Sequence, residues 1–178
     1  MYNNFSLADN QLIHQAEKFP VHSNSLKILK YGEVDNPLGI WCEIECSAGE
    51  FLSKKLAKDR FQSEFLATDT FEISSRCFFL FHDNKAVATA TAWYGEFEGE
   101  PAGRLHWVAV KKEFQGRGFS KIIVSEALSY LREYYSLAYL TTQPSSFKAI
   151  KIYLREGFTP LLESDADKKV WESVLKLI

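Results

Sequence analysis

The sequence predicts a single α/β (α+β) domain in which helices cover both faces of a mixed central sheet. Two observations lead to this fold class: a hairpin-like pair of apolar strands in mid-chain, and a strand-helix-strand-helix unit that follows it. A hairpin pairs its strands antiparallel and a crossover helix allows parallel pairing, so the sheet is mixed. The 178 residues suffice for one domain with a substantial core.

The first part of the chain alternates between apolar stretches and turn residues. Strands are expected at 26–31 and 38–44, on either side of the turn signal Asp35-Asn36-Pro37. Residues 49–65 carry large apolar side chains at broadly helical spacing, which predicts one or two helices.

A hairpin follows. Its strands are expected at 77–81 and 87–94, joined by the turn candidate Asp83-Asn84-Lys85. Residues 95–103 are rich in Gly and Glu and are predicted to form a loop.

The second half alternates regularly between strands and helices. We expect a strand at 105–110, a helix at 118–135, a strand at 137–142 and a helix at 147–155. Residues 165–177 place apolar side chains at helical spacing and predict a last helix.

The most informative segment is the turn between strand 105–110 and the helix after it. It reads Gln115-Gly116-Arg117-Gly118-Phe119-Ser120 and places little bulk over the first turn of the helix. Free amides and the positive end of the helix dipole suit a phosphate or pyrophosphate there, and Arg117 can add charge. A Gly-X-Gly pair also occurs where the backbone only turns tightly. The spacing excludes both the nucleotide triphosphate loop and the dinucleotide fingerprint.

Two segments together resemble a known family. Val108-Ala109-Val110 followed by Gln115–Ser120 resembles the acyl-CoA loop, Gln-x-x-Gly-x-Gly/Ala, of the GNAT superfamily of N-acetyltransferases, with Ser120 at the last small position. Residues 146–158 are similar to the family's Asn-x-x-Ala-x-x-x-Tyr-x-x-x-Gly-Phe helix, with Ser146 in place of Asn. The resemblance covers about 78–160, and two motifs in order make it specific.

The resemblance implies the acyl-CoA N-acyltransferase fold, in which the two central parallel strands, here 105–110 and 137–142, splay apart. It implies acetyl-CoA as co-substrate, with its pantetheine arm paired to free backbone groups at Val108 and Val110 and its pyrophosphate on the glycine turn. An amide near Val108 would stabilise negative charge on the thioester oxygen. The positions implied to bind acetyl-CoA are Val108, Ala109, Val110, Gln115, Gly116, Arg117, Gly118, Phe119, Ser120 and Ser146.

Two residues are candidates for catalysis by direct attack of an amine on the thioester. Tyr153 occupies the family's usual acid position and can donate a proton or hydrogen bond toward sulfur; alternatively it is a core aromatic. His106 is the candidate base, with a lone core or surface histidine as the alternative. If it is the base, the rate should fall below roughly pH 6 to 7. Glu96, Glu98 and Glu100 are further candidate bases, or else form a solvated loop.

The composition of the chain excludes some classes of binding partner. The formal net charge of -2 argues against a general nucleic-acid grip. No apolar run is long enough to cross a membrane and no signal-peptide pattern opens the chain, so we expect a cytoplasmic protein. Cys42, Cys46 and Cys77 make no closed disulfide set and no zinc site, which predicts buried thiols and no bound metal. A homodimer is left open.

We also expect different segments of the chain to have different roles. Residues 1–178 form one domain, with 1–75 on the acceptor side, 76–160 as the acetyl-CoA-binding core and 161–178 as a C-terminal segment. The acceptor could be a small polyamine, an amino acid, an antibiotic, a peptide N-terminus or a lysine side chain. Trp41, Trp93 and Tyr94 are candidates for an apolar wall beside it, although Trp41 fits the core better.

Three functional hypotheses remain at this stage. The first is an acetyl-CoA-dependent N-acetyltransferase. The second is an acyl-CoA binding or sensing module without turnover, which Ser146 in place of Asn and the lack of an obvious base would suit. The third is a phosphate-binding interaction domain unrelated to CoA.

Overall fold

The computed structural model describes residues 3–8, 26–67 and 70–178 and places seven strands of that part of the chain in one sheet. The strand order is β2-β3-β4-β5-β6-β1-β7. Only β5 and β6 pair in parallel; the other neighbours are antiparallel, so the expected mixed sheet is confirmed. The strands are β1 (Asn3–Ala8), β2 (Leu26–Lys30), β3 (Cys77–His82), β4 (Lys85–Phe97), β5 (Glu100–Val110), β6 (Leu137–Thr142) and β7 (Thr159–Pro160).

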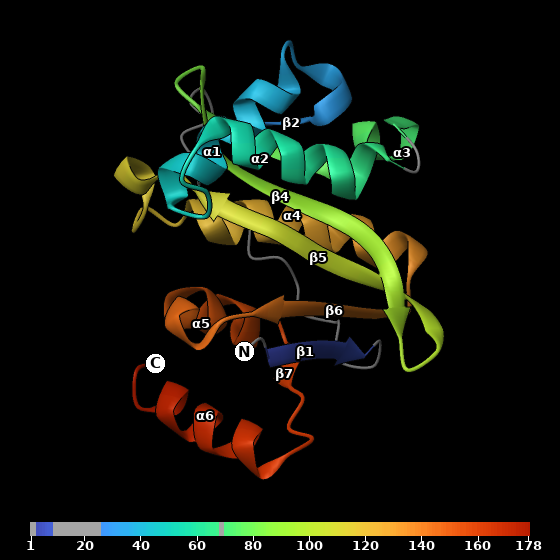
Figure 1. Ribbon diagram of the computed structural model, residues 1–178, viewed down its shortest axis with the longest axis vertical. Coiled ribbons are helices and arrows are strands. Elements are labelled where there is room, and N and C mark those ends of the chain that lie inside the picture. The colour runs from blue at the N-terminus through green and yellow to red at the C-terminus, as the bar shows by residue number, and fades with distance from the viewer. Residues whose placement is uncertain (1–2, 9–25, 68–69) are drawn as a thin grey trace.

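Helices cover both faces of the sheet (Figure 1). Phe78 and Leu80 of β3 join a core cluster with the buried face of α4, whereas Cys77 and Phe79 join a second cluster with α1 and α2. This alternation follows from the two-residue period of a strand. The helices are α1 (Pro37–Ala48), α2 (Lys54–Phe61), α3 (Thr70–Arg76), α4 (Phe119–Tyr134), α5 (Phe147–Arg155) and α6 (Asp165–Leu175). None of the helices in the described ranges is long and apolar enough to span a membrane.

The strands β5 and β6 part soon after they meet. Their pairing is limited to Gly103 with Ala138 and Arg104 with Tyr139, and β5 then continues to Val110 without a partner on that side (Figure 1). On its other side β5 carries a bulge, since the register with β4 shifts between Thr89 and Thr91. Trp107 in the bulge has a φ of +47°, a left-handed conformation that is rare for a bulky residue. The expected splay is confirmed.

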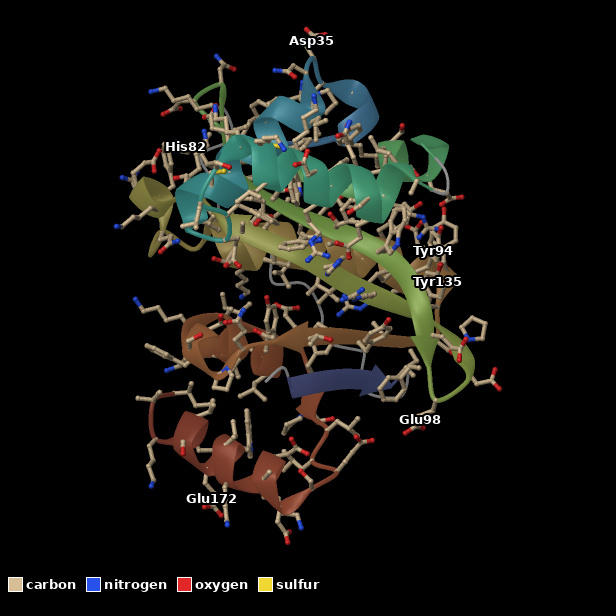
Figure 2. The ribbon with its side chains drawn as sticks, viewed as in Figure 1. Asp35, His82, Tyr94, Glu98, Tyr135 and Glu172 are labelled. Atoms are coloured by element: carbon tan, nitrogen blue, oxygen red, sulfur yellow. The ribbon has the colours of Figure 1, made fainter. Side chains whose placement is uncertain are left out.

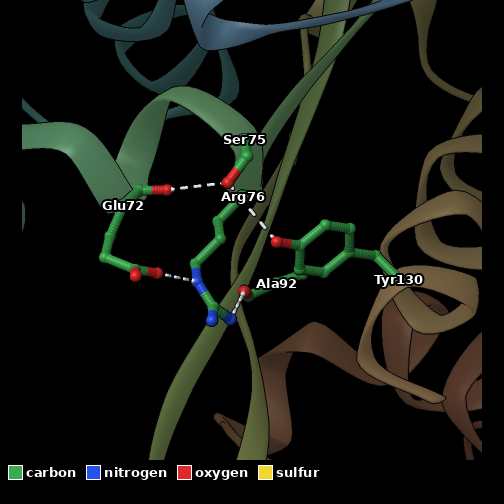
Figure 3. A network of polar contacts seen from close by, with 5 residues as sticks. All are labelled: Glu72, Ser75, Arg76, Ala92 and Tyr130. Atoms are coloured by element: carbon green, nitrogen blue, oxygen red, sulfur yellow. Dashed lines mark hydrogen bonds and ion pairs between the residues drawn. The ribbon is translucent and has the colours of Figure 1, made fainter. Parts of the chain in front are cut away.

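Polar contacts at Arg76 tie α3 to the sheet and to α4 (Figure 3). The buried Arg76 guanidinium donates from Nε to Glu72 at 2.5 Å and from Nη1 to the carbonyl oxygen of Ala92 at 3.3 Å. Ser75 Oγ lies 3.3 Å from the hydroxyl of Tyr130 on α4. These contacts join α3 to the backbone of β4 and to the side chain of Tyr130 on α4.

Two sequence expectations are wrong. Residues 38–44 are not a strand but lie in α1, because Pro37 occupies the first helical turn and the buried side chains Trp41, Cys42, Ile44 and Glu45 fall at helical spacing. Residues 95–103 are not a loop: β4 runs to Phe97 and β5 begins at Glu100, around a turn at Glu98 and Gly99. The pairing of β4 with β5 stabilises the extended conformation here, although Gly and Glu have weak strand propensity.

Other expected elements are confirmed. Asp83 and Asn84 both have positive φ, at 49° and 61°, as a tight hairpin turn requires. The expected strand at 137–142 and helix at 147–155 coincide with β6 and α5. The three cysteines are free thiols: Cys42 and Cys77 are buried as expected, whereas Cys46, one helical turn from Cys42 on α1, is partly exposed.

Removal of apolar volume beneath α4 tests this packing. Leu128 is 1% exposed in the cluster between α4 and the sheet. Leu128→Ala should lower the free energy of unfolding by about 2–5 kcal/mol, because the lost contacts leave a cavity. Urea denaturation measures the change. Leu52 is 98% exposed, so Leu52→Ala should change it by less than about 0.5 kcal/mol. Equal effects at both positions would contradict the placement of α4.

Candidate active site

A cavity of about 470 Å³ lies where β5 and β6 part. Its walls come from the diverging parts of both strands, from the end of α1 and the segment after it, from α2 and the turn that follows, and from α5. The residues that line it are Glu45, Glu50, Phe51, Arg60, Glu64, Arg104–Val108 of β5, 140–143, Ser146, Ala149 and Tyr153. Elements distant in sequence thus enclose one space beside an unpaired strand edge.

Four of the residues proposed from sequence meet in this cavity. His106 and Val108 line it from β5, and Ser146 and Tyr153 line it from the opposite side. Ala109 and Val110 are buried instead, in the core clusters on the two faces of the sheet. The carbonyl oxygen of Val110 accepts a hydrogen bond from Gln115 Nε2 at 3.0 Å, so one backbone position expected to be free already has a partner.

The glycine turn lies beyond the end of β5 and outside the lining of the cavity. Gly116 and Gly118 have φ of +77° and +82°, and a Cβ added at either would meet no atom within 4 Å. Gly118 caps the N-terminus of the 16-residue helix α4. Phe119 is buried, while the exposed Arg117 lies over the ring of Phe114 at 5.2 Å. The turn is therefore open to solvent and suits an anion at a helix N-terminus.

Tyr153 is buried, and its ring packs 6.2 Å from that of Phe158. Burial raises the pKa of the Tyr153 phenol well above 10, and the nearby carboxylates Glu50 and Glu45 raise it further. The phenol is accordingly protonated at neutral pH and is available as a hydrogen-bond donor.

Glu64 is the functional candidate that the sequence does not reveal. It lies in a π-helical turn (Gln62–Leu66) that continues α2. One carboxylate oxygen binds His106 Nε2, and the other accepts from Trp107 Nε1 at 3.0 Å, with Arg104 at 3.9 Å. Burial alone would raise the pKa of Glu64, but these donors and charges outweigh it and hold the pKa below its ordinary value.

Burial determines the protonation state of His106, and the contact with Glu64 determines its tautomer. Burial lowers the pKa of His106, the bond to Glu64 opposes that effect, and Arg104 and Arg60 lower the pKa again. The net shift is downward, so the imidazole is neutral near pH 7. Because Glu64 is an ionised acceptor, Nε2 carries the hydrogen and Nδ1 is left to accept a proton.

The π-helical turn and the aromatic wall explain how this geometry arises. A π-helical turn inserts one residue into a helix and re-aims the side chains after it, and such turns are frequent at functional sites. Trp107 packs against Trp41 at 5.6 Å and Phe51 at 5.3 Å between ring centroids. Phe51 and Trp107 therefore form the aromatic wall of the cavity, while Trp41 is buried in the core.

The acidic residues first considered as bases lie elsewhere. Figure 2 shows Glu98 at the tip of the β4–β5 hairpin, and Glu96, Glu98 and Glu100 do not belong to the lining of the cavity. Trp93 is buried and stacks on Tyr94 at 4.6 Å, also outside the cavity. Within the described ranges, no group of three or more His, Cys, Asp or Glu side chains is arranged to hold a metal.

Comparisons with known proteins agree with this fold. Solved structures with the same fold include the PH1933 protein of Pyrococcus horikoshii OT3, with a TM-score of 0.63 and 21% identity over 78% of this chain and 92% of that one. The aminoglycoside N-acetyltransferase AAC(6')-Iy in complex with CoA has a TM-score of 0.61 and 18% identity over 81% of this chain and 95% of that one.

The ribosomal-protein-S18-alanine N-acetyltransferase of Escherichia coli has a TM-score of 0.54 and 20% identity over 75% of this chain and 77% of that one. Among curated proteins, no sequence matches this chain significantly. The model of the acetyltransferase (GNAT) family matches residues 41–158, which is well over half of the chain. The chain therefore belongs to the GNAT family of acetyltransferases.

Proposed function

We propose that this protein transfers an acetyl group from acetyl-CoA to a primary amine by direct attack on the thioester. The observation that carries the proposal is the cavity at the parting of β5 and β6, which brings a neutral imidazole and a protonated phenol to the same space. Family membership supports acyl-CoA-dependent acetylation. The alternative, an acyl-CoA binding or sensing module, would not require both groups.

The chain has features that suit each part of acetyl-CoA. The open glycine turn, where added Cβ atoms at Gly116 and Gly118 would meet nothing, would bind the pyrophosphate on backbone amides. The edge of β5 near Val108 has no partner in β6 and would pair with the amide groups of the pantetheine arm as an added strand does. Ser146 would contact the arm from the opposite wall of the cavity.

Starting from the neutral amine, the reaction forms a C–N bond and breaks the C–S bond, and the nitrogen loses one proton. His106 Nδ1 would accept that proton, and Glu64 would hold the ring in the tautomer that permits it. The backbone amide near Val108 would stabilise negative charge on the carbonyl oxygen.

Tyr153 would donate a hydrogen bond to the departing sulfur. An ordinary thiol has a pKa of about 8.5, well below that of the buried phenol, so the proton stays largely on Tyr153 as the thiolate leaves. Residues 26–67 would form much of the acceptor side, since Phe51, Arg60 and Glu64 line the cavity from there.

Release of free thiol tests the function directly. With acetyl-CoA and a panel of primary amines, a thiol indicator should report CoA release that depends on the amine. Calorimetry should show acetyl-CoA binding with or without an amine. Binding without thiol release for any amine would favour the sensing module, and absence of binding would exclude both.

Substitution of Tyr153 tests the donor. Tyr153→Phe should lower kcat about 100-fold, because a donor to the developing anion is lost, while KM for acetyl-CoA changes little. The matched control is Tyr134→Phe, since Tyr134 lies on α4 with 58% exposure and outside the cavity. An unchanged kcat in Tyr153→Phe would remove Tyr153 from the mechanism.

The pH profile tests Glu64 as the positioning residue of His106. The rate should fall with decreasing pH as His106 becomes protonated, with the midpoint below the ordinary value of about 6.5 because burial lowers the pKa. Glu64→Gln removes the charge that favours imidazolium, so the His106 pKa and the acidic limb should both move to lower pH. NMR titration of the ring and kcat against pH measure the two shifts. A shift to higher pH would contradict the assignment.

A further inference from the structure

Glu45 is a buried carboxyl group that the proposed mechanism does not use. It lies in the last turn of α1, is 0% exposed, and lines the same cavity as His106 and Tyr153. Neither of its carboxyl oxygens has a hydrogen-bond partner in the described structure. A buried polar group without a partner is costly, so its presence against a cavity requires an explanation.

The surroundings of Glu45 disfavour a negative charge in the absence of a ligand. Burial raises the pKa of Glu45 well above its ordinary value, and the carboxylate of Glu50 adds to the effect. The negative end of the α1 dipole acts in the same direction. These effects favour the neutral form of the Glu45 carboxyl group, and a positive group beside it would favour the anion.

The two ends of the cavity differ in charge balance. At the β5 wall Glu64 faces His106, Arg104 and the indole of Trp107, and these supply its donors. At the α1 end, Glu45 and Glu50 both line the cavity.

The lysines near α1 are engaged on its outer side. Lys111 binds Glu43, and Lys54 lies 3.7 Å from the same carboxylate. The α1 end is thus acidic, and it holds hydrogen-bond acceptors that protein donors do not fill.

We propose that Glu45, together with Glu50, binds a second cationic group of the acceptor, so that the acceptor is a small molecule with a primary amine at one end and an ammonium or guanidinium at the other. The inference rests on the proposed function, in which His106 serves the reacting amine. On binding, the Glu45 carboxyl would release its proton to solvent and pair with the cation. A cavity of about 470 Å³ has room for a small acceptor beside the end of the pantetheine arm.

Two amines of equal chain length test the proposal kinetically. Wild-type protein with acetyl-CoA should show kcat/KM for 1,4-diaminobutane about tenfold or more above that for 1-butylamine, as expected for a charge-assisted hydrogen bond. Glu45→Gln should reduce this ratio to near one by raising KM for the diamine, with KM for acetyl-CoA unchanged. Glu43→Gln is the matched control, because Glu43 lies on the outer side of the same helix and is exposed, and it should retain the ratio.

A second measurement does not depend on turnover. In protein labelled with ¹³C at the glutamate carboxyl carbon, the resonance that is lost in Glu45→Gln identifies Glu45. In the wild type at neutral pH it should have the chemical shift of a protonated carboxyl, and saturating 1,4-diaminobutane should move it to that of a carboxylate. The uncharged analogue 1,4-butanediol should leave it unchanged. If Glu45→Gln folds poorly, the Glu45 resonance can instead be assigned from its loss in Glu45→Asp. The titration with the diamine uses the wild-type protein, so it still tests the cation site.

The outcomes separate the two proposals. Amine-dependent thiol release with equal kcat/KM for both amines, and a Glu45 carboxyl that stays protonated, would overturn the cation site and leave acetyl transfer standing. Ionisation of Glu45 by the diamine without thiol release for any amine would support the cation site and overturn acetyl transfer. If no amine releases thiol and the diamine does not ionise Glu45, both the cation site and acetyl transfer are overturned.

Discussion

The loss of pairing between β5 and β6 beyond Arg104 and Tyr139 is the constraint on which the site depends. A strand that leaves its neighbour exposes backbone donors and acceptors, and these must find other partners. The bulge at Trp107 turns β5, and the bond from its indole to Glu64 holds this part of the strand against the π-helical turn. The incomplete ladder thus creates an edge that an extended ligand can complete.

The same separation determines the charge states inside the cavity. Removal from water penalises every ionised group there, so a group is charged only where donors or opposite charges repay the loss. Glu64 has such partners and keeps a lowered pKa, whereas Glu45 has no hydrogen-bond partner in the described part of the chain and has a raised pKa. Tyr153 and His106 respond to burial in opposite directions, yet both become neutral. Burial therefore prepares a proton acceptor and a proton donor without any direct contact between the two.

The sequence predicts the second half of this fold better than the first. From residue 105 onward strands and helices alternate regularly, and each carries its own period, so β6 and α5 are found at their true bounds. The apolar content of residues 38–44 suits a strand and a helix equally. Only Pro37 at the helix start and the spacing of Trp41, Ile44 and Glu45 indicate the helix. The composition of residues 95–103 does not indicate a hairpin, because the pairing of β4 with β5 makes this segment extended.

The sequence predicts those residues of the candidate site whose position follows from a backbone motif or from the spacing of a helix. His106, Val108, Ser146 and Tyr153 follow from the two motifs and do meet in the cavity. Glu64 could not be found in this way, because the π-helical turn that aims it depends on packing against β5. Glu45 did leave a signal: an acidic residue one turn after Trp41, on what proves to be the buried face of α1. This spacing indicates a buried carboxyl group only when the segment is known to be a helix.

Three energetically unfavourable local features lie beside the same cavity. Trp107 adopts a left-handed conformation, residues Gln62–Leu66 form a π-helical turn, and Glu45 is buried without a partner. Each costs stability by itself, and natural proteins concentrate such costs at functional sites. The first two are explained by Glu64, which bonds to the indole of Trp107 from the π-helical turn and so couples one feature to the other. Among the residues that the structure describes, Glu45 has no such partner, and this asymmetry is the reason to look for its partner in the ligand.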